Sequence, residues 1–179
     1  MDLTAEGTTD WIHWGDASLT RKSSGGSQLS NYTVFGSGSV LAYANDPRPV
    51  SWSDGSPTGS STNNIKGLYI GGVGQGFTIT APADTSLRTL IVHAGGWNSS
   101  GTLTAQLNDG SGANFVDVMA AAAGQYDRNY TLYYRATSAG KMLTVTWRMT
   151  SGGGKVTLSA AALAGAEAPH AFTLVVEGR

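Results

Sequence analysis

The chain has 179 residues, 13% of them charged, and a formal net charge of −1. This length suits one domain with a sizeable core. The nearly neutral charge offers no basic field to hold a phosphate backbone, which argues against nucleic acid as a partner. The absence of cysteine excludes disulfides and thiolate metal sites, and the 25 glycines suit many short strands joined by turns.

The sequence carries no targeting segment that could be mistaken for structure. No apolar run is long enough to span a membrane, so we expect no membrane insertion. Met1 is followed at once by Asp2 and polar residues, without the apolar core of a signal peptide. We interpret the sequence as a fragment of a larger multidomain protein that is secreted or displayed at the cell surface.

The first half of the chain predicts short strands separated by polar turns. Apolar and β-branched runs place these strands at residues 2–7, 31–35, 40–44, 67–70 and 76–80. The Gly-Ser-Gly-Ser run at 36–39 predicts that the second and third of them form a hairpin. Residues 45–64 read as a long Pro/Ser-rich loop, and loops of that length are often functional.

The second half predicts longer strands, at residues 88–94, 101–107, 113–119, 130–135, 142–149 and 156–162. Turns are expected at the glycine-bearing stretches 95–98 and 152–154, and a loop at 124–128. In the strand 142–149 one face carries the large apolar side chains Leu143, Val145, Trp147 and Met149.

About ten short strands and no convincing amphipathic helix predict an all-β fold. The expected architecture is an antiparallel β-sandwich, jelly-roll-like, with another Greek-key topology as the alternative. The module is expected to cover residues 1–163. Residues 164–179 form a C-terminal extension, either a linker or an added edge strand at 170–177.

Several phrases resemble a known class of module. They occur in order at residues 10–15, 52–58, 81–90, 107–111, 133–136 and 143–147. This series is similar to the β-sandwich accessory modules of secreted bacterial proteins, many of them polysaccharide-degrading, and the chain resembles carbohydrate-binding modules in size and strand layout. The resemblance implies a role in holding an appended enzyme or a cell surface near a polysaccharide or oligosaccharide.

Two Trp-bearing stretches offer candidate sugar-binding groups on chemical grounds. Trp97 lies beside Asn98 on a glycine-rich turn, where an indole could stack on a pyranose and the amide could bind a hydroxyl. Trp52 lies in the long loop two residues before Asp54, whose carboxylate could accept from adjacent hydroxyls. The structural alternatives are a Trp97 lid over the sandwich end and a Trp52 anchor that pins the loop to the core.

Trp14 and Tyr126 complete the candidate ligand-binding set. Trp11 and Trp14 flank His13, and alternation along an extended segment predicts that one of its two faces is buried. Trp14 or Trp11 could then be an open platform, while a buried His13 paired with Asp10 is the structural alternative. Tyr126, in the expected loop, could extend a site.

Signatures of catalysis and of metal binding are mostly absent. The histidines 13, 93 and 170 lack the spacing of zinc ligands, and no Gly-x-Ser-x-Gly or His-Glu-x-x-His motif occurs. We therefore expect no catalytic residues and no cofactor. A structural calcium ion, bound by loop carboxylates and carbonyls, remains a possibility for which the sequence names no ligands.

The sequence thus predicts a non-catalytic carbohydrate-binding module and not an enzyme. The first alternative is a structural or adhesive β-sandwich of a bacterial surface protein, with every Trp used for packing. The second is a small glycan-active enzyme.

Overall fold

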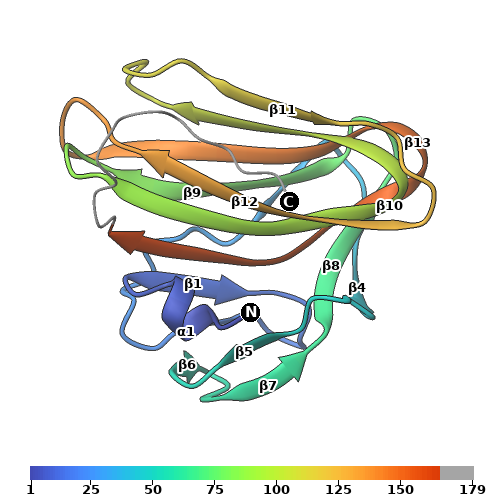
Figure 1. The fold of residues 1–179 in the computed structure, drawn as a ribbon, viewed down its shortest axis with the longest axis horizontal. Coiled ribbons are helices and arrows are strands. Elements are labelled where there is room, and N and C mark those ends of the chain that lie inside the picture. The colour runs from blue at the N-terminus through green and yellow to red at the C-terminus, as the bar shows by residue number, and fades with distance from the viewer. Residues whose placement is uncertain (166–179) are drawn as a thin grey trace.

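The structure, a computed structural model, describes residues 1–165. Within them the chain forms one short helix, α1 (Leu3–Glu6), and thirteen strands (Figure 1). The strands are β1 (Asp10–His13), β2 (Thr20–Lys22), β3 (Thr33–Phe35), β4 (Val40–Ala44), β5 (Val50–Trp52), β6 (Gly55–Ser56), β7 (Ser61–Asn64), β8 (Lys66–Gly71), β9 (Gly76–Ala83), β10 (Arg88–Leu107), β11 (Phe115–Met119), β12 (Gln125–Tyr134) and β13 (Lys141–Gly165).

Two long strands, β10 and β13, organise the fold. They pair antiparallel from Arg88 opposite Gly165 to Leu107 opposite Leu143, with one register shift at residues 93–94 and two more within residues 97–101. Such bulges bend and twist a strand pair, and the neighbours change on either side of them. β12 pairs with the first half of β10 and β11 with the second half. On β13, strands β1 and β8 flank the second half, and β9 flanks the first half.

The bent pair therefore runs through both layers of a sandwich (Figure 1). The first layer contains β12, residues 88–97 of β10, residues 155–165 of β13, β8, β4 and β1. The second layer contains β11, residues 99–107 of β10, residues 141–151 of β13, β9 and β3. All of these pairings are antiparallel, which confirms the predicted antiparallel β-sandwich.

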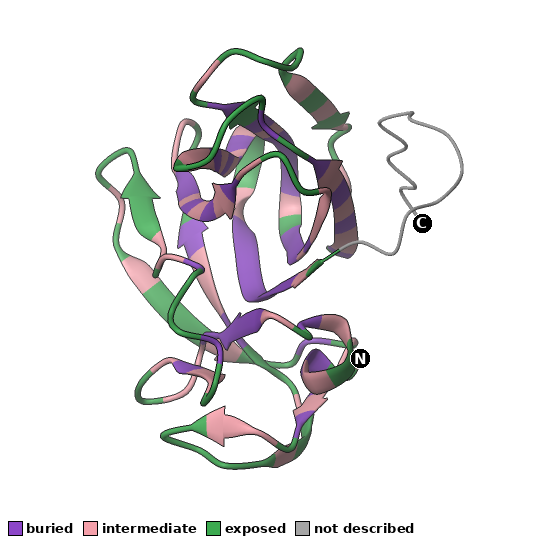
Figure 2. Ribbon diagram, turned by 90° about the vertical axis from the view of Figure 1, so that its left-hand side faces the viewer, coloured by how far each residue is buried: buried purple, intermediate pink, exposed green. Residues whose placement is uncertain are grey.

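The main core lies between the layers. Trp147 of the second layer is buried there, and its Nε1 donates to the carbonyl oxygen of Gly95 in the first layer at 2.9 Å. Figure 2 shows buried residues along the strands that face one another. The predicted apolar face of the strand at 142–149 is confirmed, because the following side chains are all buried: Leu143, Val145, Trp147 and Met149.

A second, smaller cluster lies on the opposite face of β13 and holds α1 and the β5–β7 ribbon. Its buried members are Leu3, Trp11, Val50, Trp52, Ala160 and Ala162. Ala161 and Leu163, at the alternate positions of β13, belong to the main core instead. This part of β13 is thus buried on both faces, and its run of alanines lets the flanking elements approach closely.

His13 is buried at the edge of this second cluster. Its burial leads us to expect that the free energy of unfolding depends on pH. Its ring lies 5.0 Å from the ring of Trp52, and Nε2 donates to the Lys66 carbonyl oxygen at 3.2 Å. Burial lowers the pKa of His13 below its ordinary value of 6.5, and the nearby Asp16 carboxylate opposes this only in part. The unfolded chain therefore takes up a proton near pH 6.5 that the native protein resists.

The expected result is a loss of stability as the pH falls below about 6.5, at no more than ~1.4 kcal/mol per pH unit from this group. His13→Gln should remove that part of the slope. Urea unfolding of both proteins at several values between pH 7 and pH 5 measures it, and two parallel pH profiles would contradict the assignment to His13.

Five expectations about local structure are wrong. Two of them are the expected loop at 45–64, which contains β5, β6 and β7, and the expected loop at 124–128, most of which belongs to β12. Residues 2–7 form helix α1 rather than a strand, because the Asp2 carboxylate caps it by accepting from the amides of Thr4 and Ala5. β3 and β4 do not form a hairpin: β3 pairs with β9 and β4 with β8, so their connection crosses between the layers. The expected turns at 95–98 and 152–154 lie inside β10 and β13, where glycine permits the bend without ending the strand.

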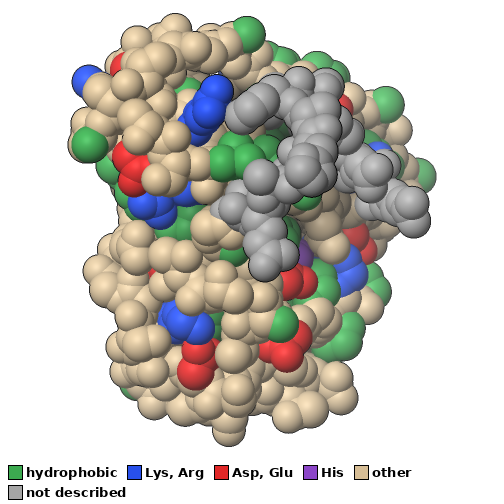
Figure 3. Space-filling model, turned by 60° about the vertical axis from the view of Figure 1, so that its left-hand side comes forward, with side chains coloured by type: hydrophobic (Ala, Val, Ile, Leu, Met, Phe, Trp, Pro, Cys, Tyr) green, Lys and Arg blue, Asp and Glu red, His purple; other side chains and the backbone are tan. Residues whose placement is uncertain are grey.

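The face of the molecule seen in Figure 3 shows small groups of charge of both signs, without a broad field of either. No helix within residues 1–165 is long and apolar enough to cross a membrane. Of the predicted C-terminal extension, residues 164 and 165 belong to β13. The edge strand expected at 170–177 lies outside the described residues.

Candidate functional site

The outward face of the first layer carries an aromatic and polar surface centred on Trp97. Tyr126, Val156 and Ile70 point into the main core, so the residues beside them on β12, β13 and β8 point outward. Strand register aligns the outward residues in rows. One row contains Gln125, Trp97 and Lys155, and the next contains Asp127, Gly95, Thr157 and Tyr69.

Trp97 is exposed because it sits at the bend of β10. The indole is 46% exposed, and the following Asn98 has a positive φ of 48°. Gly154 lies against this bend on β13, where a Cβ atom would meet the Trp97 carbonyl oxygen at 1.7 Å. Glycine at that position is therefore required for the two strands to pass each other while the indole faces solvent.

A hollow of about 160 Å³ opens beside Trp97. Its lining residues come from four first-layer strands, β4, β10, β12 and β13, and from the loop that follows β4: Tyr43, Asn45, Gly96, Trp97, Gln125, Lys155 and Thr157. Gly95 contributes no side chain to this face, and a Cβ atom there would lie 3.0 Å from Thr157 Oγ1. The surface next to Trp97 is therefore recessed at Gly95, and amide and hydroxyl groups surround the recess.

Arg48 fastens the loop after β4, which forms one wall of the hollow, to the first layer. Its guanidinium donates to the carbonyl oxygens of Ala94 and Arg128 at 3.1 and 3.0 Å, and to Asn129 Oδ1 at 2.6 Å. It also pairs with Asp46 at 3.3 Å and with Asp127 at 3.2 Å. The wall is therefore held by a network that spans β10 and β12.

Tyr43 supplies a fixed hydroxyl to the same wall. The hydroxyl donates to Asp46 Oδ2 at 2.6 Å. Burial, together with the Asp46 carboxylate, raises the pKa of Tyr43 far above its ordinary value. The group stays protonated at every pH at which the protein would be used.

Lys155 is the cation of the hollow. Its Nζ lies 4.0 Å from the centroid of the Tyr69 ring and 5.8 Å from that of Trp97. Within residues 1–165 no carboxylate pairs with it, and the nearby acids Asp46 and Asp127 are both bound by Arg48. The ammonium is held by ring faces rather than by a counter-charge.

Trp97 and Asn98 are the predicted site residues that lie at this surface. The indole is open as expected, although it lies in a strand and not in a turn. Asn98 is half-buried, and its Oδ1 accepts from the Gly124 amide at 2.6 Å. That bond orders the start of β12 beside Trp97, so the amide oxygen serves the scaffold.

Trp52 and Asp54 lie elsewhere and face inward. Trp52 is 3% exposed, packs on the Trp11 ring at 5.5 Å, and donates from Nε1 to the Thr58 carbonyl oxygen at 2.9 Å. Asp54 accepts from the Trp11 indole, from the Thr4 hydroxyl and from the Lys22 ammonium. Burial acts to raise the pKa of Asp54, but these hydrogen bonds outweigh it and hold the pKa below its ordinary range. The pair anchors the long loop, and the interpretation of Trp52 as a stacking platform is wrong.

Trp14 and Tyr126 are also packing residues. Trp14 is 2% exposed, and its Nε1 donates to Asn31 Oδ1 at 2.8 Å. Tyr126 lies in β12, with its ring edge-on to Trp147 in the main core and its hydroxyl 3.0 Å from Ser99 Oγ. Alternation along β12 turns its neighbour Gln125, and not Tyr126, toward the hollow.

Sequence reasoning missed most of the lining, namely Tyr43, Asn45, Gln125, Lys155 and Thr157. Each occupies an ordinary strand or loop position, and only the pairing register of four separate strands brings them together. The one available signal was the outward alternation of Lys155 and Thr157 against Val156 and Leu158.

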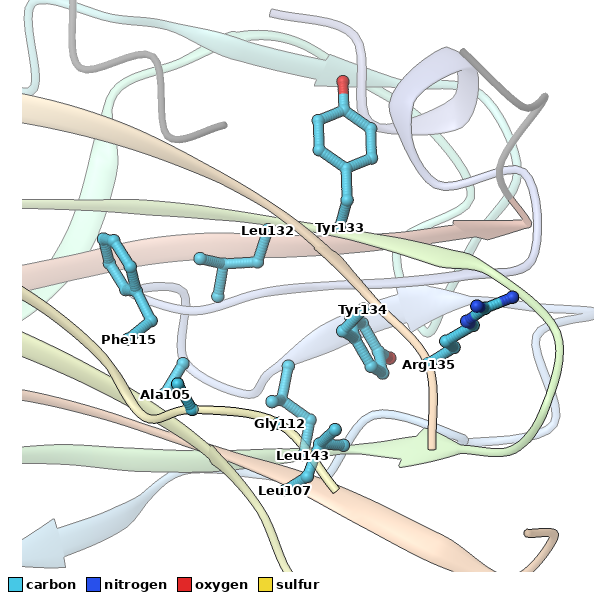
Figure 4. A pocket seen from close by; sticks show the side chains of 10 residues that line it. Ala105, Leu107, Gly112, Phe115, Leu132, Tyr133, Tyr134, Arg135 and Leu143 are labelled. Atoms are coloured by element: carbon cyan, nitrogen blue, oxygen red, sulfur yellow. The ribbon is translucent and has the colours of Figure 1, made fainter. Parts of the chain in front are cut away.

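A second pocket lies between the layers at one end of the sandwich (Figure 4). Its lining is mostly apolar, with Leu107 and Leu143 from the second layer and Leu132 and Tyr134 from the first. The Tyr134 hydroxyl donates to the Pro82 carbonyl oxygen at 2.9 Å. This pocket has few groups that could read sugar hydroxyls, so the Trp97 hollow is the better candidate.

No group of three or more His, Asp or Glu side chains within residues 1–165 could hold a metal ion. The structural calcium ion therefore remains a prediction without ligands. His93, one of the buried histidines, is held instead between the Glu6 carboxylate at 2.7 Å and Asn129 Oδ1 at 2.9 Å.

Comparison with known proteins finds no matching protein-family model and no matching curated protein. Among solved structures, a CBM22 xylan-binding domain from Paenibacillus barcinonensis is similar over 77% of this chain and 87% of its own, at 13% identity and a TM-score of 0.47. TmCBM61, solved with β-1,4-galactotriose, is similar over 76% of this chain and 90% of its own, at 12% identity and a TM-score of 0.46.

The enzymatically active domain of tailspike protein 4 from bacteriophage CBA120 is similar over a small part of its own length. It matches 77% of this chain and 20% of its own, at 12% identity and a TM-score of 0.46. At such identities and scores these likenesses assign no function, so the function of this chain must be inferred from the geometry of its own hollow.

Proposed function

We propose that the protein is a non-catalytic carbohydrate-binding module whose ligand site is the Trp97 hollow. The observation that carries the proposal is an indole 46% exposed on a strand, with a hollow of about 160 Å³ beside it that is lined by amide, hydroxyl and ammonium groups. A pyranose presents C–H groups on one face and hydroxyls around its edge, and this arrangement matches both.

The chemistry of the lining supports binding without cleavage. Glycoside hydrolysis uses two carboxylates that flank the scissile bond, and the lining residues of the hollow include neither Asp nor Glu. Asp46 and Asp127, which follow the lining residues Asn45 and Gln125 by one and two positions, are both paired with Arg48. The same proposal includes a secreted or cell-surface location and attachment to further domains, which would suit a module of modest affinity acting with others.

Trp97→Ala should reduce glycan affinity by about five- to tenfold, because one ring stacked on a sugar contributes about 1–1.4 kcal/mol. It should leave stability nearly unchanged, since the ring is half open to water. Isothermal titration against a panel of soluble oligosaccharides, with urea unfolding alongside, measures both effects.

The matched control is Val118→Ala, which removes another exposed apolar side chain, 67% exposed, from β11 of the second layer. Equal glycan affinity of Trp97→Ala and wild type would show that the glycan does not bind in the hollow. If no member of the panel binds, the structural or adhesive alternative replaces the proposal.

A further inference from the structure

The hollow carries one positive charge that no carboxylate within residues 1–165 neutralises. Lys155 Nζ stands near the rings of Tyr69 and Trp97, at 4.0 and 5.8 Å from their centroids. Residues 1–165 provide no carboxylate as its partner, whereas Lys22 pairs with Asp54 and Lys66 with Asp16. A cation so placed is a ready partner for an anionic ligand group.

The surroundings of Lys155 keep that charge available. Arg48 forms ion pairs with the two acids near lining residues in sequence, Asp46 at 3.3 Å and Asp127 at 3.2 Å, so both already have a cationic partner other than Lys155. The remaining lining residues are neutral: Tyr43, Asn45, Gly96, Trp97, Gln125 and Thr157. Arg48 thus separates the local acids from the one cation that faces the ligand.

We propose that the hollow binds an acidic sugar, with the sugar ring on Trp97 and its anionic group on Lys155. This inference rests on the proposed function and names the class of ligand. A uronic acid meets the requirement directly, since its carboxylate is attached to the pyranose ring itself and therefore lies within a few ångströms of a stacked face. A sulfated sugar offers the same charge on a longer arm.

Gln125 and Thr157 fit the same arrangement. Both line the hollow, Gln125 opposite Trp97 on β12 and Thr157 two residues along β13 from Lys155. They supply donors and acceptors for neutral hydroxyls on either side of the charged contact. The acidic group would therefore add to a set of neutral contacts and would not replace them.

The test uses a ligand pair that differs in charge and by one methyl group per sugar: a short oligogalacturonate and its methyl ester, each titrated at low and high salt, together with a sulfated oligosaccharide. The wild-type protein should bind the free acid about tenfold more tightly than the ester at low salt, and the difference should shrink as salt screens the charge. Lys155→Gln should lose that preference, and Lys155→Arg should keep it. Lys141→Gln, on the same strand in the second layer, is the matched control and should behave as wild type.

The outcomes separate the acidic-sugar proposal from the function itself. Equal affinity for acid and ester, with binding that Trp97→Ala abolishes, overturns the role of Lys155 and leaves carbohydrate binding intact. A preference for the acid that survives in Lys155→Gln also overturns it. Failure of every sugar to bind overturns both proposals. Preference for the sulfated ligand over the uronate, if lost in Lys155→Gln, supports the anionic site and selects the sulfate as its ligand.

Discussion

Trp52→Ala should lower the free energy of unfolding by about 3–5 kcal/mol, the range typical of a buried Trp replaced by Ala. The indole is 3% exposed and packs on the rings of Trp11 and His13, at 5.5 and 5.0 Å. Its loss opens a cavity between the β5–β7 ribbon and β13. It also leaves the Thr58 carbonyl oxygen without its indole donor.

Urea unfolding of the variant measures the loss, and Trp52→Phe provides the matched control. The phenyl ring keeps most of the packing and loses the N–H group, so its cost should be nearer to ~1 kcal/mol, a single hydrogen bond. A Trp52→Ala protein that is as stable as wild type but binds sugar poorly would restore Trp52 as a binding residue. The contrast with Trp97→Ala, which should affect binding and spare stability, separates the two tryptophans by role.

The two tryptophans also show what sequence could and could not establish. Alternation correctly predicts which face of a strand is buried, as Leu143, Val145, Trp147 and Met149 show. The glycines before Trp97 correctly indicated an exposed indole, although the chain there bends without leaving the sheet. Local pattern therefore predicts the strands and the sandwich, because period-two burial is a local property.

The role of Trp52 depends on residues that are far away in sequence. The ring packs on Trp11, forty-one positions earlier, and against the alanines of β13, more than a hundred positions later. A Pro/Ser-rich segment with an adjacent carboxylate looks the same from sequence whether its indole points inward or outward. The lining of the hollow poses the same difficulty, since it assembles from β4, β10, β12 and β13.

The absence of a hairpin between β3 and β4 has a similar origin. The Gly-Ser-Gly-Ser run allows a tight turn, but Gln75 Oε1 accepts from the amides of Ser37 and Gly38 and holds the run in a crossing between the layers. The residues of a turn show only which backbone conformations are possible there. The strands with which β3 and β4 pair are determined by packing across the whole sandwich.

Arg48→Met should lower the free energy of unfolding by about 3–5 kcal/mol, the cost expected when one partner of a buried ion pair is removed. The Asp46 side chain is 1% exposed, and Arg48 is the cation that neutralises it. The variant would leave that carboxylate buried without a counter-charge. It would also release two carbonyl oxygens of the first layer.

The comparison for this variant is Lys66→Met, which breaks an ion pair with Asp16 whose lysine is 49% exposed. Exposed pairs contribute little, so its cost should stay within about 1 kcal/mol. Thermal or urea unfolding of both variants gives the two values. Equal costs would show that Arg48 is an ordinary surface cation and not the clamp of the loop.

A double variant, Arg48→Met with Asp46→Asn, separates two roles of Arg48: neutralising the Asp46 carboxylate, and hydrogen bonding the loop after β4 to the first layer. Removing the unpaired carboxylate should recover part of the lost stability, because the buried charge is gone. Arg48→Met should also weaken glycan binding, and the double variant should not restore it, because the bonds from Arg48 to Ala94, Arg128 and Asn129 hold the wall that carries Asn45. If the double variant recovered both stability and glycan binding in full, the loop after β4 would keep its position without the hydrogen bonds of Arg48. Only the unpaired charge of Asp46 would then have caused the losses.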